Sequence, residues 1–255
     1  MFFRGMYLSG LFAAAMATTA GAATLQVNSF DRTDLVGAHS ALAAFNAAPT
    51  AGKVIKASRT EDFESFGAWN GTSGTRNPAT TVGTFASAGG QGHAGDTIDG
   101  GTFLEVRNDN PLRSTRFNTS GAGNWLDSND TYGMTWEVGG LPKFNALAFL
   151  LTDVADQGAK FSITIGGTLF ESVIGDGTRL ADGGIYLVTI LLPKTVSTLS
   201  IAMTNDKLND GFGIDQAMVA RVAPVPVPPA ALLLLSGIVG IAGLRRRFGF
   251  RMRAA

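Results

Sequence analysis

The stretch KFSITIGGTLFESVI, residues 160–174, decides the fold class of this chain. Apolar and polar side chains alternate on both sides of Gly166-Gly167, which is the period-two pattern of a half-buried strand. Glycine readily adopts the positive φ angles that a two-residue hairpin turn requires. The stretch therefore predicts two antiparallel strands joined by a tight turn through the two glycines.

Similar short apolar stretches recur along the chain and are separated by turns rich in Gly, Asp and Asn. They predict further strands at 60–66, 80–87, 101–108, 131–138, 144–153, 185–192, 198–204 and 212–222. Strands at this spacing are typical of an antiparallel sandwich. We therefore expect one all-β domain over residues 24–222, an antiparallel β-sandwich of the jelly-roll type.

One segment departs from this pattern and predicts a short N-terminal helix over residues 35–48. Leu35, Ala38, Leu42 and Phe45 recur at helical spacing. The acidic residues between 31 and 34 offer N-caps, and a proline follows the segment at position 49.

Composition excludes several classes of protein. The chain has no cysteine, so it contains neither a disulfide scaffold nor a thiolate metal site. Residues 24–222 carry 14 basic and 20 acidic side chains, a net charge of 14 − 20 = −6. This stretch shows no basic pattern with interleaved aromatics, so we expect no nucleic-acid partner. Gly90–Gly95 spells G-x-G-x-x-G without a following helix, which favours a surface loop over a phosphate site.

The N-terminal residues 1–23 have the pattern of a secretory signal peptide. Arg4 precedes an apolar stretch from Met6 to Ala17, and small residues surround a cleavage position at Ala22 or Ala23. We therefore expect signal peptidase to remove this segment and the domain to be exported.

The C-terminal residues 223–255 have three parts. A proline-rich stretch is followed by fifteen uncharged residues from Ala230 to Leu244, and then by Arg245, Arg246 and Arg247. As a helix, residues 230–244 would be about 23 Å long, against the roughly 30 Å of a bilayer core. This predicts a marginal transmembrane helix whose arginines stay in the cytoplasm.

This tail resembles the PEP-CTERM class of sorting domains, in particular its VPLPA-CTERM variant. The residues that carry the resemblance are the apolar stretch, the arginines and the proline motif Val225, Pro226, Val227, Pro228, Pro229 and Ala230. The resemblance implies a Gram-negative bacterium that makes exopolysaccharide, and processing by a membrane-embedded exosortase. The body would be periplasmic while the chain is anchored in the inner membrane, and would then reach the cell surface or extracellular matrix.

Two strands extend this resemblance into the domain. TEDFESF (60–66) resembles an opening strand, and NDGFGIDQAMVARV (209–222) a closing strand, of jelly-roll proteins in this class. In related carbohydrate-binding jelly rolls, acids of the first and last strands meet at a structural calcium ion, which takes six to eight oxygen ligands. The resemblance thus suggests Glu64, Asp210 and Asp215 as calcium ligands. Alternatively, they are ordinary polar residues at strand ends.

Two further acidic clusters favour turns over ligand sites. LDSNDTYG (126–133) contains part of a calcium-loop pattern but lacks its downstream glutamate, and Asx turns account for it. Asp153 and Asp156 lie three residues apart at the end of a predicted strand and would cap a turn.

Trp69 and Trp125 lie beside asparagines in predicted loops, which suits stacking against a sugar. Alternatively, these rings cover the ends of the core. No nucleophile or metalloprotease motif is present, so we expect no enzyme. The sequence predicts a structural or adhesive surface protein associated with exopolysaccharide. A carbohydrate-binding module and a secreted carbohydrate-active enzyme that uses two carboxylates are the alternatives.

Overall fold

The structure, a computed structural model, describes residues 22–50, 52–89, 103–108, 115–120, 123–129, 131–207 and 210–224. The signal segment as far as Gly21 and the sorting motif with the helix 230–244 lie outside these residues. Among the described residues, no helix combines the length and the apolar character needed to cross a bilayer.

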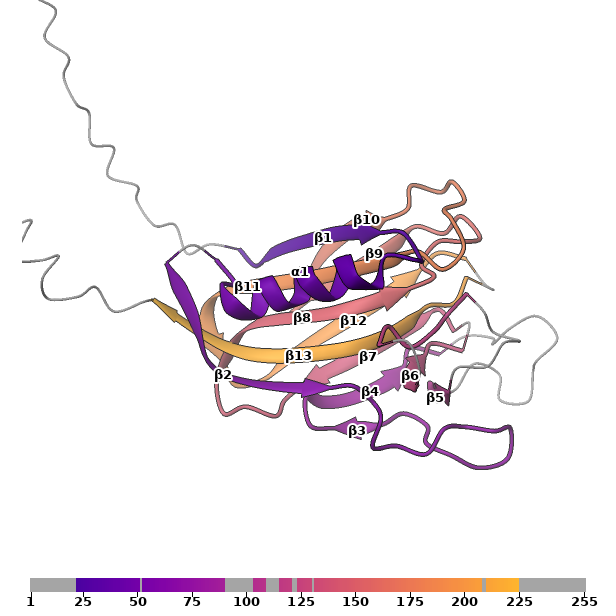
Figure 1. Ribbon diagram of the computed structural model, residues 1–255, viewed down its shortest axis with the longest axis horizontal. Helices are drawn as coiled ribbons and strands as arrows, with labels where there is room; N and C mark the ends of the chain where they lie inside the picture. Colours follow the sequence, from indigo (N-terminus) through magenta and orange to yellow (C-terminus); the bar gives the residue numbers. More distant parts are fainter. Residues whose placement is uncertain are drawn as a thin grey trace, which may run out of the picture.

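The chain forms two antiparallel sheets (Figure 1). The seven-stranded sheet A has the order β1 (Thr24–Phe30), β11 (Ile185–Val196), β8 (Phe144–Thr152), β13 (Gly213–Pro224), β6 (Asn124–Asp127) and β5 (Glu105–Asn108), and β2 (Lys53–Glu61) also pairs with β13. The six-stranded sheet B has the order β10 (Thr168–Ile174), β9 (Phe161–Ile165), β12 (Leu199–Asn205), β7 (Gly133–Val138), β4 (Gly83–Ser87) and β3 (Ala79–Thr80). The prediction of an antiparallel, sandwich-like all-β domain is confirmed.

The hairpin predicted from residues 160–174 is also confirmed. Ile165 of β9 pairs with Thr168 of β10, and Gly166 and Gly167 have φ angles of 54° and 87°. Several strands differ from the prediction. The sequence analysis missed β1 and placed residues 124–127 in a loop. The expected strand 60–66 shares only Thr60 and Glu61 with β2, and the expected strand 80–87 is divided into β3 and β4.

The core between the sheets is aromatic. Trp136 of β7 stacks on Phe85 of β4 with ring centroids 5.0 Å apart, and it meets Phe149 of β8 edge to face at 5.9 Å. The indole Nε1 of Trp136 donates to the carbonyl oxygen of Val82. Residues from both sheets thus share one buried cluster, and this contact holds the sandwich together.

The apolar run of β8 reflects burial on both faces. Leu147 and Phe149 belong to the core between the sheets, whereas Ala146 and Ala148 lie in a second cluster beneath helix α1 (Leu35–Ala47). Small side chains at these outward positions allow the helix to approach the sheet closely. We call the face of sheet A that α1 covers the outer face; Figure 1 shows the helix lying across it.

The helix confirms the sequence prediction closely. It begins after Asp34, whose carboxylate accepts a hydrogen bond from the Gly37 amide at 2.9 Å. Such a side chain satisfies an amide that has no partner within the helix. Ala38 and Leu42 are buried against sheet A, so packing fixes the helix in place.

Sheet A has two distinct ends. At one end, which we call the terminal end, the sheet register aligns Thr24, Leu191, Ala146 and Ala220. At the opposite loop end, it aligns Phe30, Ile185, Thr152, Gly213, Asp127 and Glu105. The start of β1 and the finish of β13 therefore lie at the same end, on the left in Figure 1.

Candidate functional site

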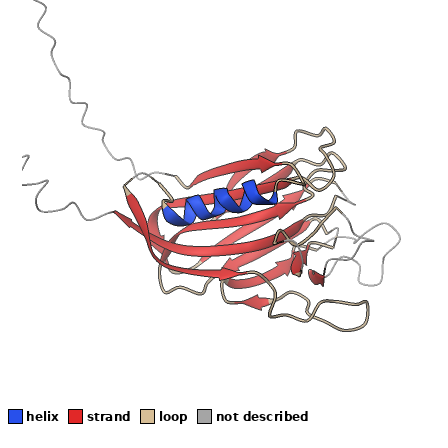
Figure 2. Cartoon of the chain, viewed as in Figure 1, coloured by secondary structure: helices blue, strands red, loops and turns tan. Residues whose placement is uncertain are grey.

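Buried carboxylates gather at the loop end of the sandwich, where Figure 2 shows several long loops. Glu105 and Asp127 belong to the aligned row that defines this end. Asp153 directly follows β8, and Asp210 shortly precedes β13. Their exposed fractions do not exceed 3%. Because burying a charge costs free energy unless it is paired, these groups are the first place to look for a site.

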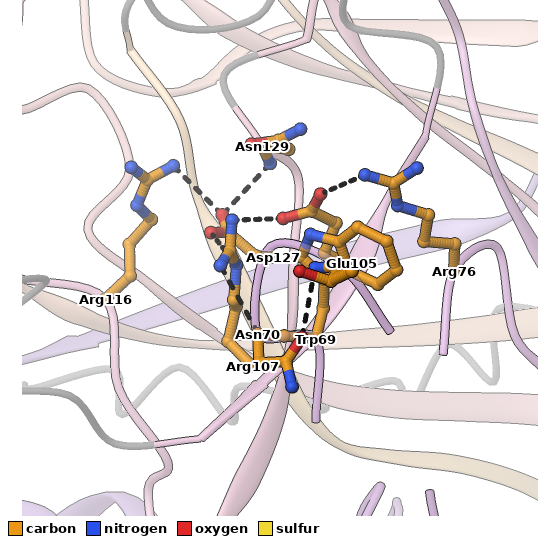
Figure 3. A network of polar contacts seen from close by, with 9 residues as sticks. Trp69, Asn70, Arg76, Glu105, Arg107, Arg116, Asp127 and Asn129 are labelled. Atoms are coloured by element: carbon orange, nitrogen blue, oxygen red, sulfur yellow. Dashed lines mark hydrogen bonds and ion pairs between the residues drawn. The ribbon is translucent and has the colours of Figure 1, made fainter. Parts of the chain in front are cut away.

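Three arginines surround two of these carboxylates (Figure 3). We call this set the arginine–carboxylate cluster; it comprises Arg76, Glu105, Arg107, Arg116 and Asp127. Asp127, 0% exposed, accepts hydrogen bonds at 3.0 Å from Nη1 of Arg116 and from the Asn129 amide. Its Oδ2 lies 3.8 Å from Nε of Arg107. Asp127 therefore joins two arginines at the centre of the cluster.

Glu105 joins the other pair of arginines. Its Oε1 accepts from Nη2 of Arg76 at 3.2 Å, and its Oε2 forms an ion pair with Arg107. Burial raises the pKa of the Glu105 carboxyl, while the nearby Arg107 charge acts to lower it. Arg107 thus contacts both carboxylates and couples them.

Strand alternation places this cluster on the outer face. Val106 and Leu126 contribute to the core between the sheets. Glu105, Arg107 and Asp127 occupy the alternate positions and therefore lie on the opposite face. The sequence analysis did not single out the arginines. An acid and a base two residues apart in a strand, as in LEVRN, is a signal that could have found them.

Trp69 lies at the edge of the cluster. The guanidinium carbon of Arg76 is 3.5 Å from the Trp69 ring centroid and 5.0 Å from that of Phe103. The Trp69 amide donates to Val106, and Nη1 of Arg107 to the Trp69 carbonyl. The ring is half-buried and Asn70 is exposed. The loop therefore presents an aromatic ring, an amide side chain and a guanidinium together.

Trp125 is placed differently from the prediction. It lies in β6 rather than in a loop and is 1% exposed. A Cβ atom at Gly213 would lie 3.0 Å from Cε3 of the indole, so the ring packs directly on the β13 backbone. Trp125 therefore offers no exposed surface for a sugar to stack on, and the structure leaves Trp69 as the candidate.

The suggested calcium ligands bind separate protein groups. Oε1 of Glu64 accepts from Nδ2 of Asn118 and from the Asn124 amide, both at 2.9 Å. Oδ2 of Asp215 accepts from the amide and the hydroxyl of Thr119 at 2.9 and 2.7 Å.

Asp210 makes its contacts elsewhere, in the loop after β8. Its Oδ2 accepts from the amides of Gln157 and Ala159 at 3.1 and 2.8 Å. Across the described parts of the chain, no group of three or more His, Cys, Asp or Glu residues has an arrangement that could hold a metal ion. Calcium binding by Glu64, Asp210 and Asp215 therefore stays a prediction.

Segment 115–120 covers the outer face beside helix α1. Nε2 of His39 donates to the Thr119 carbonyl oxygen at 2.8 Å, and Thr119 in turn donates to Asp215. Together with the contact between Arg116 and Asp127, these bonds tie the segment to the helix and to two strands. Carboxylates of sheet A thus fix the position of this loop segment.

The chain matches no model of a protein family and no curated protein.

The buried aspartates predict that stability falls as pH rises. Burial raises the pKa of Asp153 to about 7 and that of Asp215 to about 6, from an ordinary value of 3.8. The folded state therefore holds these protons more tightly than the unfolded state does. Between about pH 4 and pH 7, the free energy of unfolding should decrease by about 3 kcal/mol through Asp153.

Urea unfolding of wild type and of Asp153→Asn at several pH values measures this effect. The variant carries no titrating group at that position, so the difference between the two free energies should change with pH over this range. A difference that stays constant from pH 4 to pH 8 would contradict the assignment.

Proposed function

We propose that this chain is an exported cell-surface protein that attaches to exopolysaccharide through the loop end of its sandwich. The observation that carries the proposal is that the arginine–carboxylate cluster lies at one end of sheet A, and the start of β1 and the finish of β13 lie at the other. The twelve residues of β13 span about 40 Å between the loop end and the terminal end. A tether at the terminal end would leave the arginine–carboxylate cluster directed away from the point of attachment.

The proposed tether is the C-terminal segment. Strand β13 finishes at Pro224, and the PEP-CTERM-like motif begins at Val225. Prolines disfavour both helix and sheet, so a proline-rich motif directly after the last strand suits access by an exosortase-type enzyme. Signal peptidase would act before Thr24, where β1 begins. The protein would thus pass through an inner-membrane intermediate to the surface or matrix.

The chemistry at the loop end suits a polyhydroxylated ligand. Trp69 provides part of an aromatic surface, Asn70 is exposed, and the guanidinium of Arg76 lies against the Trp69 ring. Sugars are commonly bound by a flat apolar surface flanked by hydrogen-bond donors and acceptors. This arrangement supports polysaccharide as the ligand class.

We also propose that the sandwich is a jelly roll, as the sequence analysis expected. Strands β2, β13, β8 and β11 are consecutive neighbours in sheet A, and β7, β12, β9 and β10 in sheet B. The chain visits them in the order β2, β7, β8, β9, β10, β11, β12, β13, and this is the order of two successive Greek keys. The remaining strands extend the edges of this arrangement.

The processing step predicts the mass of the mature protein. In a host with its exosortase, the mature protein should begin near Ala23 and lack the segment 230–255. Replacing both Pro226 and Pro228 by Ala should leave the full tail in place, because the recognised motif is lost. Intact-mass spectrometry measures both products, and a wild-type protein that retains Ala255 would contradict processing.

Polysaccharide binding at the loop end predicts that substitutions at the two ends of sheet A affect binding differently. Arg76→Ala should weaken pull-down of the chain by the exopolysaccharide of the producing cells at least tenfold, since it removes a charged donor and the support of Trp69. Arg221→Ala, at an exposed position of β13 near the terminal end, is the matched control and should bind like wild type. Equal binding by both variants would contradict a site at the loop end.

A further inference from the structure

Asn70 is the one asparagine in the sequence that is followed by glycine. Both residues belong to the loop that holds Trp69, and residues 70–74 are all exposed. The backbone nitrogen of the next residue can attack an asparagine side chain, and glycine hinders this attack least because it has no Cβ atom. The Asn70-Gly71 pair is therefore the position in this chain where the covalent structure most favours deamidation.

The loop surrounds the side-chain oxygen of Asn70 with hydrogen-bond donors. Oδ1 of Asn70 accepts from the amides of Thr72 and Ser73 at 3.0 and 2.9 Å, and from the Ser73 hydroxyl at 3.4 Å. The Asn70 amide donates to the Ser73 carbonyl oxygen at 3.0 Å, which closes the turn. When a nitrogen attacks Cγ, negative charge develops on Oδ1, and backbone amides directed at that oxygen stabilise the charge.

The attacking nitrogen is accessible. The Gly71 amide donates no hydrogen bond to any residue that the structure describes. Gly71 has a φ angle of 98°, and a Cβ atom at this position would meet nothing within 4 Å. No hydrogen bond of Gly71 therefore has to break before its nitrogen approaches Cγ of Asn70.

We propose that Asn70 is a deamidation site of the folded protein. The Gly71 nitrogen bonds to Cγ of Asn70 and loses its proton, the bond between Cγ and Nδ2 breaks, and Nδ2 leaves with a proton as ammonia. The product is a succinimide ring. Water then adds at Cγ to give aspartate, or at the backbone carbonyl carbon to give isoaspartate, in which the main chain runs through Cγ. Solvent water is the only co-reactant.

Aspartate is the product that the turn can retain. An ionised carboxylate accepts the same hydrogen bonds from Thr72 and Ser73, now charge-assisted, whereas isoaspartate lengthens the backbone and disrupts them. The reaction adds a negative charge beside Trp69, at the edge of the arginine–carboxylate cluster (Figure 3), and removes the amide donor of Asn70. Deamidation should therefore weaken polysaccharide binding. This consequence rests on the proposed function, whereas the modification itself does not.

Asn28 provides a matched control within the same chain. It is also exposed and is followed by a small residue, Ser29, but it lies in β1, which pairs with β11 over its whole length. Ring closure requires the next amide nitrogen to lie beside Cβ of the asparagine, and a strand holds the backbone extended instead. Asn28 should therefore deamidate only when β1 opens.

Peptide mapping of the full chain in mild detergent, after incubation at mildly alkaline pH, tests the proposal. Trypsin cleaves after Arg59 and Arg76, so residues 60–76 form one peptide, whose asparagine, aspartate and isoaspartate forms are separated by chromatography. Asn70→Asp supplies the aspartate standard. Each rate is compared with that of the same chain in guanidinium chloride. Folding should leave the rate at Asn70 undiminished, whereas it should make the rate at Asn28 roughly tenfold lower.

A rate at Asn70 that falls on folding as far as the rate at Asn28 would overturn the proposal, because the turn would then protect the side chain. The effect on binding has a separate readout. Pull-down of a partly reacted sample by the exopolysaccharide should leave the aspartate form enriched in the unbound fraction, and equal shares in both fractions would overturn that effect. If no chain is bound at all, the proposed polysaccharide function fails and the deamidation site is unaffected.

Discussion

Asp127→Ala is expected to lower the free energy of unfolding by about 3–5 kcal/mol, since it leaves two buried arginines without their shared carboxylate. Asp127 is 0% exposed, and the side chains of Arg116 and Arg107 are 12% and 16% exposed. The variant also removes the acceptor for the Asn129 amide. For a domain of this size, the melting temperature should fall by roughly 10 °C.

Asp182→Ala is the matched control for this prediction. Asp182 also accepts a hydrogen bond from an arginine, Arg179, at 3.0 Å, but the two side chains are 49% and 62% exposed. Exposed pairs of this kind contribute little, so the melting temperature should change by no more than about 2 °C. Similar melting temperatures for the two variants would show that the buried ion pairs of Asp127 contribute no more to stability than an exposed pair does.

Trp136→Ala should lower the free energy of unfolding by about 3–5 kcal/mol, because it opens a cavity in the core between the sheets. The ring contacts Phe85 in its own sheet and Phe149 in the other. Its removal also leaves the Val82 carbonyl without the indole donor. Urea unfolding followed by circular dichroism measures the loss.

Tyr132→Ala separates this effect from the general loss of an aromatic ring. Tyr132 is 47% exposed, so its replacement should cost less than about 1 kcal/mol. A comparable loss in both variants would mean that the two sheets do not depend on the ring stack at Trp136. The expected contrast would instead assign it a central part in holding the sheets together.

Much of the fold follows from local pattern. Alternation around Gly166-Gly167 predicted the hairpin correctly, because the period of a strand and the turn preference of glycine are local properties. The capped helix from Leu35 was equally visible. Strand β6 was not, since its four residues, NWLD, are too few to show a period. Its pairing with β5 over all four residues and with Gly213 and Ile214 of β13 makes it a strand.

The candidate site was less accessible to sequence reasoning. Asp127 was interpreted as a turn residue, and the arginines that surround it come from positions 76, 107 and 116. No short motif connects these positions. The contact between Trp69 and Arg76 has the same origin, because the loop that holds the tryptophan is positioned by β5.

By itself, the sequence determined the antiparallel class of the domain, its hairpin and its helix, and it predicted the signal and sorting segments at the two ends. These features depend on the order of neighbouring residues. The tertiary structure alone decided that Trp125 is buried and that Asp127 joins two arginines. It also decided that the start of β1 and the finish of β13 both lie at the end of sheet A opposite the cluster. Each of these depends on which strands become neighbours, and strand neighbours are set by packing across the whole sandwich.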